Sequence, residues 1–283
     1  MGKQSIWLIN NEASGSNDED ALGLFENACA DCGLTVAHRT VFPNQDLPTA
    51  EVLDAAGIET VAIFAGDGTI NTVLETLAGW SGAVLVLPGG TMNLLYHRLF
   101  GDMETADALA AVAEGRALRR RPGVIETDYG HAFAGVLAGP GTAWGDVREA
   151  MRSKGPLDMA AEARAAIAET LYGTMLRVDE PEMGKREGYP LLLLTPTDTG
   201  IEIDAYHAET AGEYLEQALA LAKREFRDGP HDRLGKAERF VLASTARDGF
   251  GVLLDGEQCQ VDGPTEFRLV PCQVDLLATV ADD

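Results

Sequence analysis

The chain has 283 residues, of which 46% are hydrophobic and 6% aromatic, which suits one large or two modest domains with ample core. Its formal net charge is −23, and so acidic a surface repels polyanions, which argues against a nucleic-acid partner. No apolar stretch approaches the roughly 18–20 residues that a transmembrane helix needs, and the short apolar run after Met1 fits a strand better than a signal peptide. We therefore expect a cytoplasmic protein with no transmembrane segment.

The first 115 residues alternate between strand and helix patterns. Strands are predicted at 5–10, 34–42, 60–65 and 83–87, and helices at 18–32, 48–56, 70–78, 92–100 and 104–114. Strands that are separated by helices form parallel sheets, and continuous apolar runs such as 83–87 suit strands that are buried on both faces. The sequence therefore predicts an α/β domain with a doubly wound parallel sheet.

The basic stretch RALRRRPGVI, at 116–125, interrupts this alternation. We place a domain boundary there, giving domains 1–121 and 122–283, with the last residues able to pack back on the first domain. The cluster reads as a solvated helix end, or as a surface that faces phosphate or anionic lipid headgroups. Beyond it, strands are expected at 132–138, 191–195, 240–245, 251–254 and 274–280, and helices at 144–153, 157–171 and 209–226. The second domain is therefore expected to be mainly β.

Two glycine-rich loops follow buried strands and precede helices. They are Gly66–Thr69 and Gly89–Thr91, and Gly15 supplies a third loop after the first strand. In a parallel sheet, ligands bind beyond the carboxyl ends of the strands, where helix N-termini converge. Glycine lets the backbone approach a ligand closely, and successive amides bind anions. The loops therefore favour a phosphate site, which includes Gly68 and Gly90.

Asp67 lies between two glycines of the first loop, where a bare carboxylate would repel phosphate oxygens. It could orient Mg²⁺ through water or handle the proton of a hydroxyl nucleophile. Alternatively, Asp67 or Thr69 caps the first turn of the helix, an interaction worth about 1 kcal/mol. Asn71 and Asn93, near the starts of the two helices, are either polar ligand contacts or exposed first-turn residues.

Near the C-terminus, Asp255-Gly256-Glu257 lies between two strand patterns, which is typical of a β-hairpin.

The Cys29–Cys32 pair is interpreted as two ordinary buried thiols, or as half of a zinc site shared with Cys259 and Cys272. Neither a G-x-x-x-x-G-K-[ST] loop nor a dinucleotide-binding G-x-G-x-x-G fingerprint is present, which excludes the commonest nucleotide motifs.

Four motifs, taken in order, resemble those of the diacylglycerol kinase catalytic-domain family, which includes bacterial lipid kinases and sphingosine kinases. They are NNEASG from Asn10, AGDGTINT from Ala65, PGGTMNL from Pro88 and DGE from Asp255. The resemblance implies an N-terminal nucleotide domain, a C-terminal β-sandwich and a kinase that uses ATP and Mg²⁺. By motif, the implied ATP contacts are Asn10, Ser14, Thr40, Gly66, Asp67, Gly68, Thr69 and Thr91.

The same resemblance makes Glu257 the proton acceptor for a lipid hydroxyl, with Asp255 beside it in the catalytic set. Three positions depart from the family pattern: Ala65 replaces a glycine, Thr72 a glutamate, and Leu94 an aspartate that helps to organise the Mg²⁺ and water network. The last change could weaken metal binding, shift the substrate, or mark a chain that binds nucleotide and turns over poorly.

The leading hypothesis is a lipid kinase that acts on diacylglycerol or a sphingoid lipid at the inner membrane face. The alternatives are a small-molecule kinase resembling NAD kinase, and a non-catalytic protein that binds nucleotide or lipid. The oligomeric state is open, a homodimer included.

Overall fold

The computed structural model of the chain describes residues 4–11, 19–90, 92–139, 174–206 and 232–280. By its contacts the chain forms two compact units, Met1–Pro122 with Pro271–Asp283, and Gly123–Val270. No helix among the described residues is long and apolar enough to cross a bilayer. Several predictions fall outside the described residues, namely the helices at 144–153, 157–171 and 209–226 and the site residues Ser14, Gly15 and Thr91.

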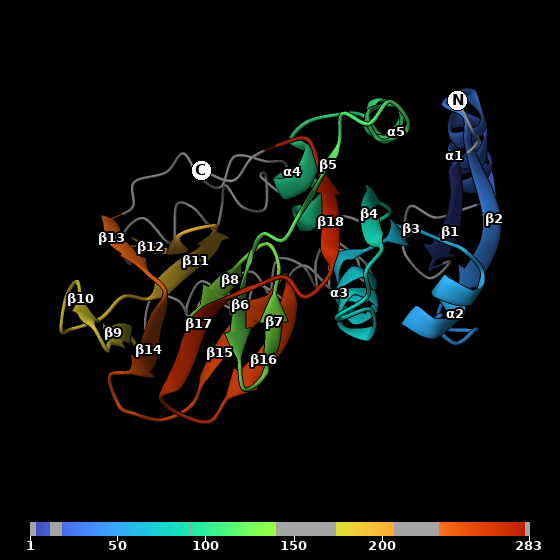
Figure 1. The fold of residues 1–283 in the computed structure, drawn as a ribbon. Coiled ribbons are helices and arrows are strands. Elements are labelled where there is room, and N and C mark those ends of the chain that lie inside the picture. The colour runs from blue at the N-terminus through green and yellow to red at the C-terminus, as the bar shows by residue number, and fades with distance from the viewer. Residues whose placement is uncertain (1–3, 12–18, 91, 140–173, 207–231, 281–283) are drawn as a thin grey trace, which may run out of the picture. The chain divides into compact units, whose positions relative to one another are not determined.

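The first unit contains a six-stranded sheet in the order β2-β1-β3-β4-β18-β5 (Figure 1). Its strands are β1 (Gln4–Asn10), β2 (Leu34–Val41), β3 (Thr60–Ala65), β4 (Ala83–Pro88), β5 (Leu118–Arg120) and β18 (Asp275–Ala278). Its helices are α1 (Glu19–Asp31), α2 (Ala50–Ala55), α3 (Asp67–Thr76), α4 (Leu94–Phe100) and α5 (Thr105–Ala113). Every residue of β3 is buried, as its continuous apolar run predicts.

The sheet is mixed rather than wholly parallel. β1, β2, β3, β4 and β18 are parallel to their neighbours in this series, whereas β5 pairs antiparallel with β18. The steps from β1 to β2 and from β2 to β3 run in opposite directions along the sheet. Because crossovers between parallel strands are right-handed, this reversal places α1 and α2 on opposite faces.

The basic stretch runs from the end of α5 into the edge strand β5. Arg116 follows the last turn of α5, where its amide donates to the Ala111 carbonyl at 2.8 Å, whereas Arg119 and Arg120 lie on β5 and not at a helix end. Arg119 Nη1 donates to the Ser81 carbonyl at 2.8 Å, and Arg121 Nε donates to Asp275 Oδ1 at 2.7 Å. Two of the arginines therefore stabilise the edge of the sheet. Charged side chains on an edge strand also discourage pairing with another chain.

The second unit is built from two six-stranded antiparallel sheets (Figure 1). The first has the order β10-β9-β14-β17-β6-β7 and the second β13-β12-β11-β8-β15-β16. The strands are β6 (Gly123–Thr127), β7 (Gly130–Ala132), β8 (Val136–Ala138), β9 (Leu176–Asp179), β10 (Glu182–Met183), β11 (Leu191–Thr197), β12 (Gly200–Tyr206), β13 (Asp232–Ala237), β14 (Arg239–Ser244), β15 (Phe250–Leu254), β16 (Glu257–Val261) and β17 (Thr265–Pro271).

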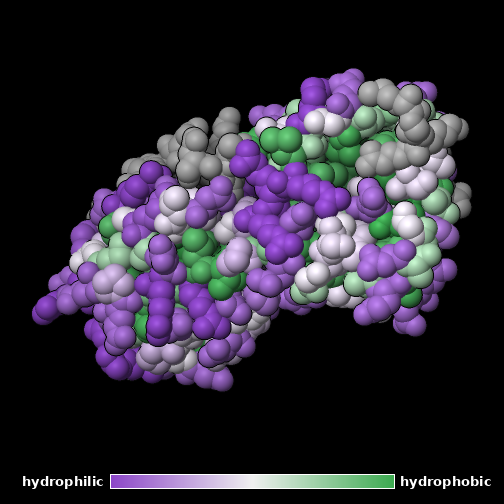
Figure 2. Space-filling model, in the orientation of Figure 1, coloured by the Kyte–Doolittle hydropathy of each residue, from purple (hydrophilic) through white to green (hydrophobic). Residues whose placement is uncertain are grey.

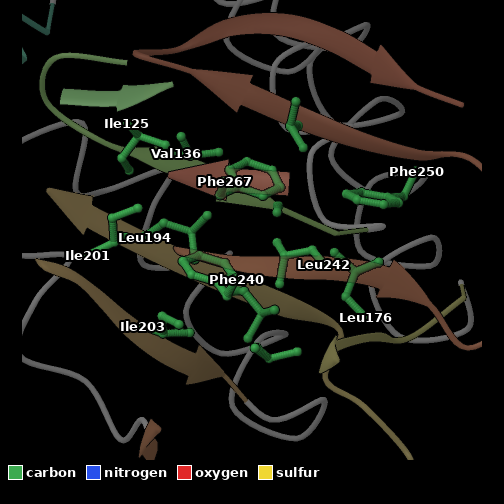
Figure 3. Packing of buried hydrophobic residues seen from close by; sticks show 14 of the residues in the cluster. Ile125, Val136, Leu176, Leu194, Ile201, Ile203, Phe240, Leu242, Phe250 and Phe267 are labelled. Atoms are coloured by element: carbon green, nitrogen blue, oxygen red, sulfur yellow. The ribbon is translucent and has the colours of Figure 1, made fainter. Parts of the chain in front are cut away.

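One hydrophobic core joins the two sheets of the second unit (Figure 3). Phe240 and Phe267 stack at its centre with ring centroids 5.7 Å apart, and Leu194 and Ile203 of the other sheet belong to the same cluster. Two sheets that each have one apolar face bury those faces by packing them against each other. On the face seen in Figure 2, hydrophobic residues show only in small groups between hydrophilic ones.

Most predicted elements of the first unit agree with the structure to within two residues, but α3 does not. The helix begins at Asp67 rather than at the predicted Ile70. In the second unit, the run at 132–138 is two short strands, β7 and β8, rather than one. The two-residue strand β10, between β9 and β11, was not predicted.

Candidate functional site

The first glycine loop is the junction between β3 and α3. Gly66 has an extended backbone with φ −80° and ψ 165°, and its carbonyl accepts hydrogen bonds from the amides of Thr69 and Ile70 at 3.0 and 3.1 Å. The chain therefore turns directly from strand to helix. Asp67, Gly68 and Thr69 form the first turn of α3, and of their amides that of Thr69 is bonded to the Gly66 carbonyl.

The second glycine loop packs directly against the first. The Gly89 amide donates to the Ala65 carbonyl at 3.2 Å. A Cβ atom on Gly89 would lie 2.5 Å from the Ala65 nitrogen, and one on Gly90 would lie 2.6 Å from the Gly66 Cα. No side chain fits at either position, so glycine is required for the two backbones to approach each other.

Asn93 closes the second loop. Its side-chain Oδ1 accepts a hydrogen bond from the Gly90 amide at 2.8 Å, and its Nδ2 donates to the Gly90 carbonyl at 3.0 Å. Its backbone is left-handed, with φ 52° and ψ 42°, at the position before α4. Asparagine tolerates this conformation better than most residues, so Asn93 has a structural role that its predicted position in a first turn did not indicate.

Asp67 is the first residue of α3, where the positive end of the helix dipole favours a carboxylate. Its Oδ1 accepts a long hydrogen bond, 3.4 Å, from the Leu95 amide in the first turn of α4. The residue at the cap position of α3 is Gly66, which has no side chain to bond to the first-turn amides. Asp67 instead connects the starts of the two helices that follow the glycine loops.

The end of β1 belongs to the same region. Asn11 Nδ2 donates to the hydroxyl of Thr69 at 2.9 Å, which ties the end of β1 to the first turn of α3. Asn10 is fully buried, and its Oδ1 accepts a hydrogen bond from Arg39 Nε at 3.0 Å. The sequence prediction included Asn10 but neither Asn11 nor Arg39. The only sequence signal for Arg39 is its rarity as a basic residue in this half of the chain.

Thr40, predicted as a nucleotide contact, is buried on the neighbouring strand β2. Its hydroxyl accepts a hydrogen bond from the indole Nε1 of Trp7 at 2.9 Å, and Trp7 stacks on His38 with ring centroids 4.4 Å apart. The accepted bond leaves the Thr40 hydroxyl hydrogen available to donate.

The departures from the family pattern have local consequences. The Thr72 hydroxyl, at the position of the family glutamate, donates to the Gly68 carbonyl at 3.0 Å. Leu94 is the first residue of α4, so an apolar side chain stands where the family has a carboxylate. Asp67 is consequently the only carboxylate on the two glycine loops.

This donor set fits one mode of Mg²⁺ binding. Within the described residues no three His, Cys, Asp or Glu side chains form a group that could hold a metal by themselves. Mg²⁺ in phosphotransferases is, however, held by one or two carboxylates together with phosphate oxygens and water. A single carboxylate beside amides that can hold phosphate is compatible with that mode.

All four cysteines are free thiols. Among the described residues they do not form a group that could hold zinc. Burial is the largest cause that raises the pKa of Cys29 to about 12, and the nearby Cys32 adds to it, so this thiol stays protonated.

A cavity of about 500 Å³ lies between α1 and β2, lined by residues from Glu26 to Arg39. None of the residues that line it belongs to the glycine loops. The candidate site is therefore the one defined by the contact between the two loops, and not this open cavity.

In the second unit, Asp255-Gly256-Glu257 forms the predicted hairpin turn. Leu254 pairs with Glu257, and both turn residues have positive φ, 47° at Asp255 and 86° at Gly256. Such a pair of conformations matches the twist of the flanking strands, which is why an Asp-Gly pair is favoured here. Glu257, the first residue of β16, is exposed.

The Asp255 carboxylate has a structural role that the sequence did not reveal. It is 3% exposed and accepts three backbone hydrogen bonds from a segment more than 100 residues away. Its Oδ2 accepts from the Phe133 amide at 2.6 Å, and its Oδ1 accepts from the Ala134 and Gly135 amides at 2.8 and 2.9 Å. Asp255 therefore holds the loop between β7 and β8 against the hairpin that carries Glu257.

Comparisons with known proteins agree with the resemblance seen in the motifs. A family model for the diacylglycerol kinase catalytic domain matches residues 5–123. A crystal structure of a diacylglycerol kinase from Bacillus anthracis strain Sterne aligns with 98% of this chain and 97% of its own, with a TM-score of 0.59 at 14% identity. Two further solved structures of a diacylglycerol kinase-like protein from that strain give TM-scores of 0.60 and 0.61 at 14% and 15% identity over the same shares. A search of curated proteins gives no match.

Proposed function

We propose that this chain, whose first domain resembles the diacylglycerol kinase catalytic domain, is an ATP-dependent lipid kinase. It would transfer the γ-phosphoryl group to the hydroxyl of a lipid such as diacylglycerol or a sphingoid lipid. The family match supports a kinase-type function, and the fold is that of diacylglycerol kinase-like proteins. The lipid class, the use of ATP and a working place at the inner membrane face are our proposals.

The observation that carries the proposal is the backbone contact between the two glycine loops. A Cβ atom on Gly90 would lie 2.6 Å from the Gly66 Cα, so the two backbones approach too closely for a side chain on Gly90. The first loop leads directly into the ten-residue helix α3. The glycine loops themselves contain no lysine or arginine, so phosphate groups would be held mainly by loop amides and by the N-terminus of α3.

Two carboxylates have proposed roles in phosphoryl transfer. Glu257 would accept the proton of the lipid hydroxyl as that oxygen attacks phosphorus. Asp67 would lie beside the phosphates, held at the start of α3 and bonded to the Leu95 amide. Mg²⁺, when bound, would neutralise charge on the β- and γ-phosphate oxygens. Catalysis would come mostly from positioning and charge neutralisation rather than from covalent chemistry on the protein.

Asp255 is better explained as a positioning residue than as a catalytic residue. All three of its hydrogen bonds to the 133–135 segment are to backbone amides, and its side chain is buried. Its proposed contribution is to fix the hairpin turn from which Glu257 projects.

The proposal is tested by radiolabelled phosphate transfer from ATP to a panel of lipids in mixed micelles with Mg²⁺. Glu257→Gln is expected to lower kcat by about 100-fold or more, since a general base contributes roughly 10²–10⁴. Asp67→Asn is also expected to lower kcat, since it removes the carboxylate proposed to help hold Mg²⁺. Glu238→Gln is the matched control, because Glu238 is an exposed glutamate of the same unit. Lipid phosphorylation that is unchanged in both site variants would refute the assignment.

A non-catalytic nucleotide-binding protein is the second candidate. It is favoured by Leu94, which leaves Asp67 as the only carboxylate on the glycine loops. ATP binding without phosphate transfer to any lipid of the panel, and without transfer to NAD, would support this second function over the kinase.

A further inference from the structure

Arg39 is a rare basic residue in the N-terminal part of the chain. Before Arg116, the basic residues are Lys3, Arg39 and Arg98. Arg39 is exposed and lies near the end of β2, and its Nε donates to Asn10 Oδ1 at 3.0 Å. A guanidinium has donors but no acceptor, so this contact fixes the orientation of the Asn10 side-chain amide, with Oδ1 toward Arg39 and Nδ2 directed elsewhere.

Asn10 then has a donor that the described residues do not use. The residue is 0% exposed, and its Nδ2 has no hydrogen-bond partner among the described residues. Leaving a buried polar group without a partner destabilises a fold. A fold that keeps such a donor at the carboxyl end of a central strand is suited to a ligand that brings an acceptor.

The pair lies beside the glycine loops. β1 neighbours β3 in the sheet, and Asn10 pairs with Phe64, two residues before Gly66. Neighbouring strands are about 4.8 Å apart. The next residue, Asn11, bonds directly to the hydroxyl of Thr69 in the first turn of α3. A phosphate chain on the loop amides can therefore extend to the end of β1.

We propose that Arg39 and Asn10 form a phosphate subsite, with Asn10 Nδ2 and the Arg39 guanidinium donating to oxygens of one phosphate group. This inference rests on the proposed function, in which the ligand is a nucleoside triphosphate. Asn10 belongs to one of the four motifs that carry the family resemblance, whereas Arg39 lies outside them. Its charge offsets part of the repulsion that so acidic a protein exerts on a polyphosphate.

The test is isothermal titration calorimetry of the full chain with ATP, tripolyphosphate and adenosine, each at 50 and 300 mM KCl with EDTA present. Arg39→Ala is expected to weaken binding of ATP and tripolyphosphate about tenfold, because charge-assisted hydrogen bonds to phosphate are lost, and to leave adenosine binding within twofold. It should also lower the dependence of affinity on salt, which reports the lost charge.

Two further variants make the result specific. Arg116→Ala removes an exposed arginine that pairs with Glu114, and binding of all three ligands should stay within twofold. Arg39→Lys keeps the charge, and its salt dependence should match that of the wild type. Circular dichroism confirms that each variant is folded.

The outcomes separate this inference from the proposed function. The subsite is refuted if wild-type protein binds no tripolyphosphate, if Arg39→Ala binds it normally, or if adenosine binding falls in the same proportion. If Arg39→Ala behaves as expected but the wild type phosphorylates no lipid, the subsite stands and the kinase assignment fails.

Discussion

Replacing Asp255 with Asn tests whether this residue positions the hairpin that carries Glu257. Asparagine tolerates the positive φ of 47° at this position, so the backbone of the turn should survive. Its Oδ1 can still accept the bonds from Ala134 and Gly135. In the wild type the Phe133 amide donates to Asp255 Oδ2 at 2.6 Å. In the variant an NH₂ group takes the place of Oδ2, so two hydrogen-bond donors would face each other.

The expected cost follows from the bonds lost. Leaving the buried Phe133 amide without an acceptor costs about 1–3 kcal/mol, and exchanging a charged acceptor for a neutral one weakens the two remaining bonds by about 0.5 kcal/mol each. The sum is about 2–4 kcal/mol. Local opening of the segment should therefore increase at least thirtyfold, since 1.4 kcal/mol is about a factor of ten.

Hydrogen exchange of a peptide that covers residues 130–138 measures this opening in the full chain. Asp262→Asn is the matched control, because Asp262 is also followed by glycine but is exposed, and it should change the exchange rate less than threefold. An Asp255→Asn variant that exchanges like the control, yet has lost lipid phosphorylation, would refute the positioning role and favour a catalytic one.

Three further predictions concern the first unit. Gly90→Ala should destabilise the protein by about 1–3 kcal/mol and weaken ATP binding, because the new Cβ would lie 2.6 Å from the Gly66 Cα. Gly23→Ala is the control, because Gly23 lies at an open position in α1, and it should stabilise the protein by up to about 1 kcal/mol. Thermal unfolding measures both changes in stability. Burial raises the pKa of Tyr96 to about 12, so the stability it contributes is full below pH 10 and is lost as the pH rises from 10 to 12; urea titrations of Tyr96→Phe should lack that part of the loss. Cys29, whose pKa is raised to about 12, should resist iodoacetamide at pH 8 in the native protein and react once the protein is unfolded, as mass spectrometry would show.

Local patterns in the sequence were sufficient for several elements. Apolar runs and helical periodicity located the strands β1, β3 and β4 and the helix α5, because the side-chain period reports directly which faces are buried. The Asp-Gly pair located the hairpin between β15 and β16, because positive φ restricts the choice of residues. The motif series gave the family resemblance, which the match over residues 5–123 confirms.

The same patterns could not locate elements whose stability depends on partners. β13 (Asp232–Ala237) has no continuous apolar run and was not predicted, yet it pairs along β12. The start of α3 was predicted three residues late, because Gly68 was taken for a loop residue. In the structure, Gly66 supplies the extended position before the helix, and glycine is tolerated within its first turn.

For the candidate site, the sequence by itself determined which residue types are present: two glycine loops with a single carboxylate, a late D-G-E, and a scarcity of basic residues. Only the tertiary structure decided what these residues do. It joined Asp67 to Leu95, Asp255 to the 133–135 amides and Arg39 to Asn10. The physical reason is that a hydrogen bond depends on distance in space, and these partners lie between 28 and 122 residues apart along the chain.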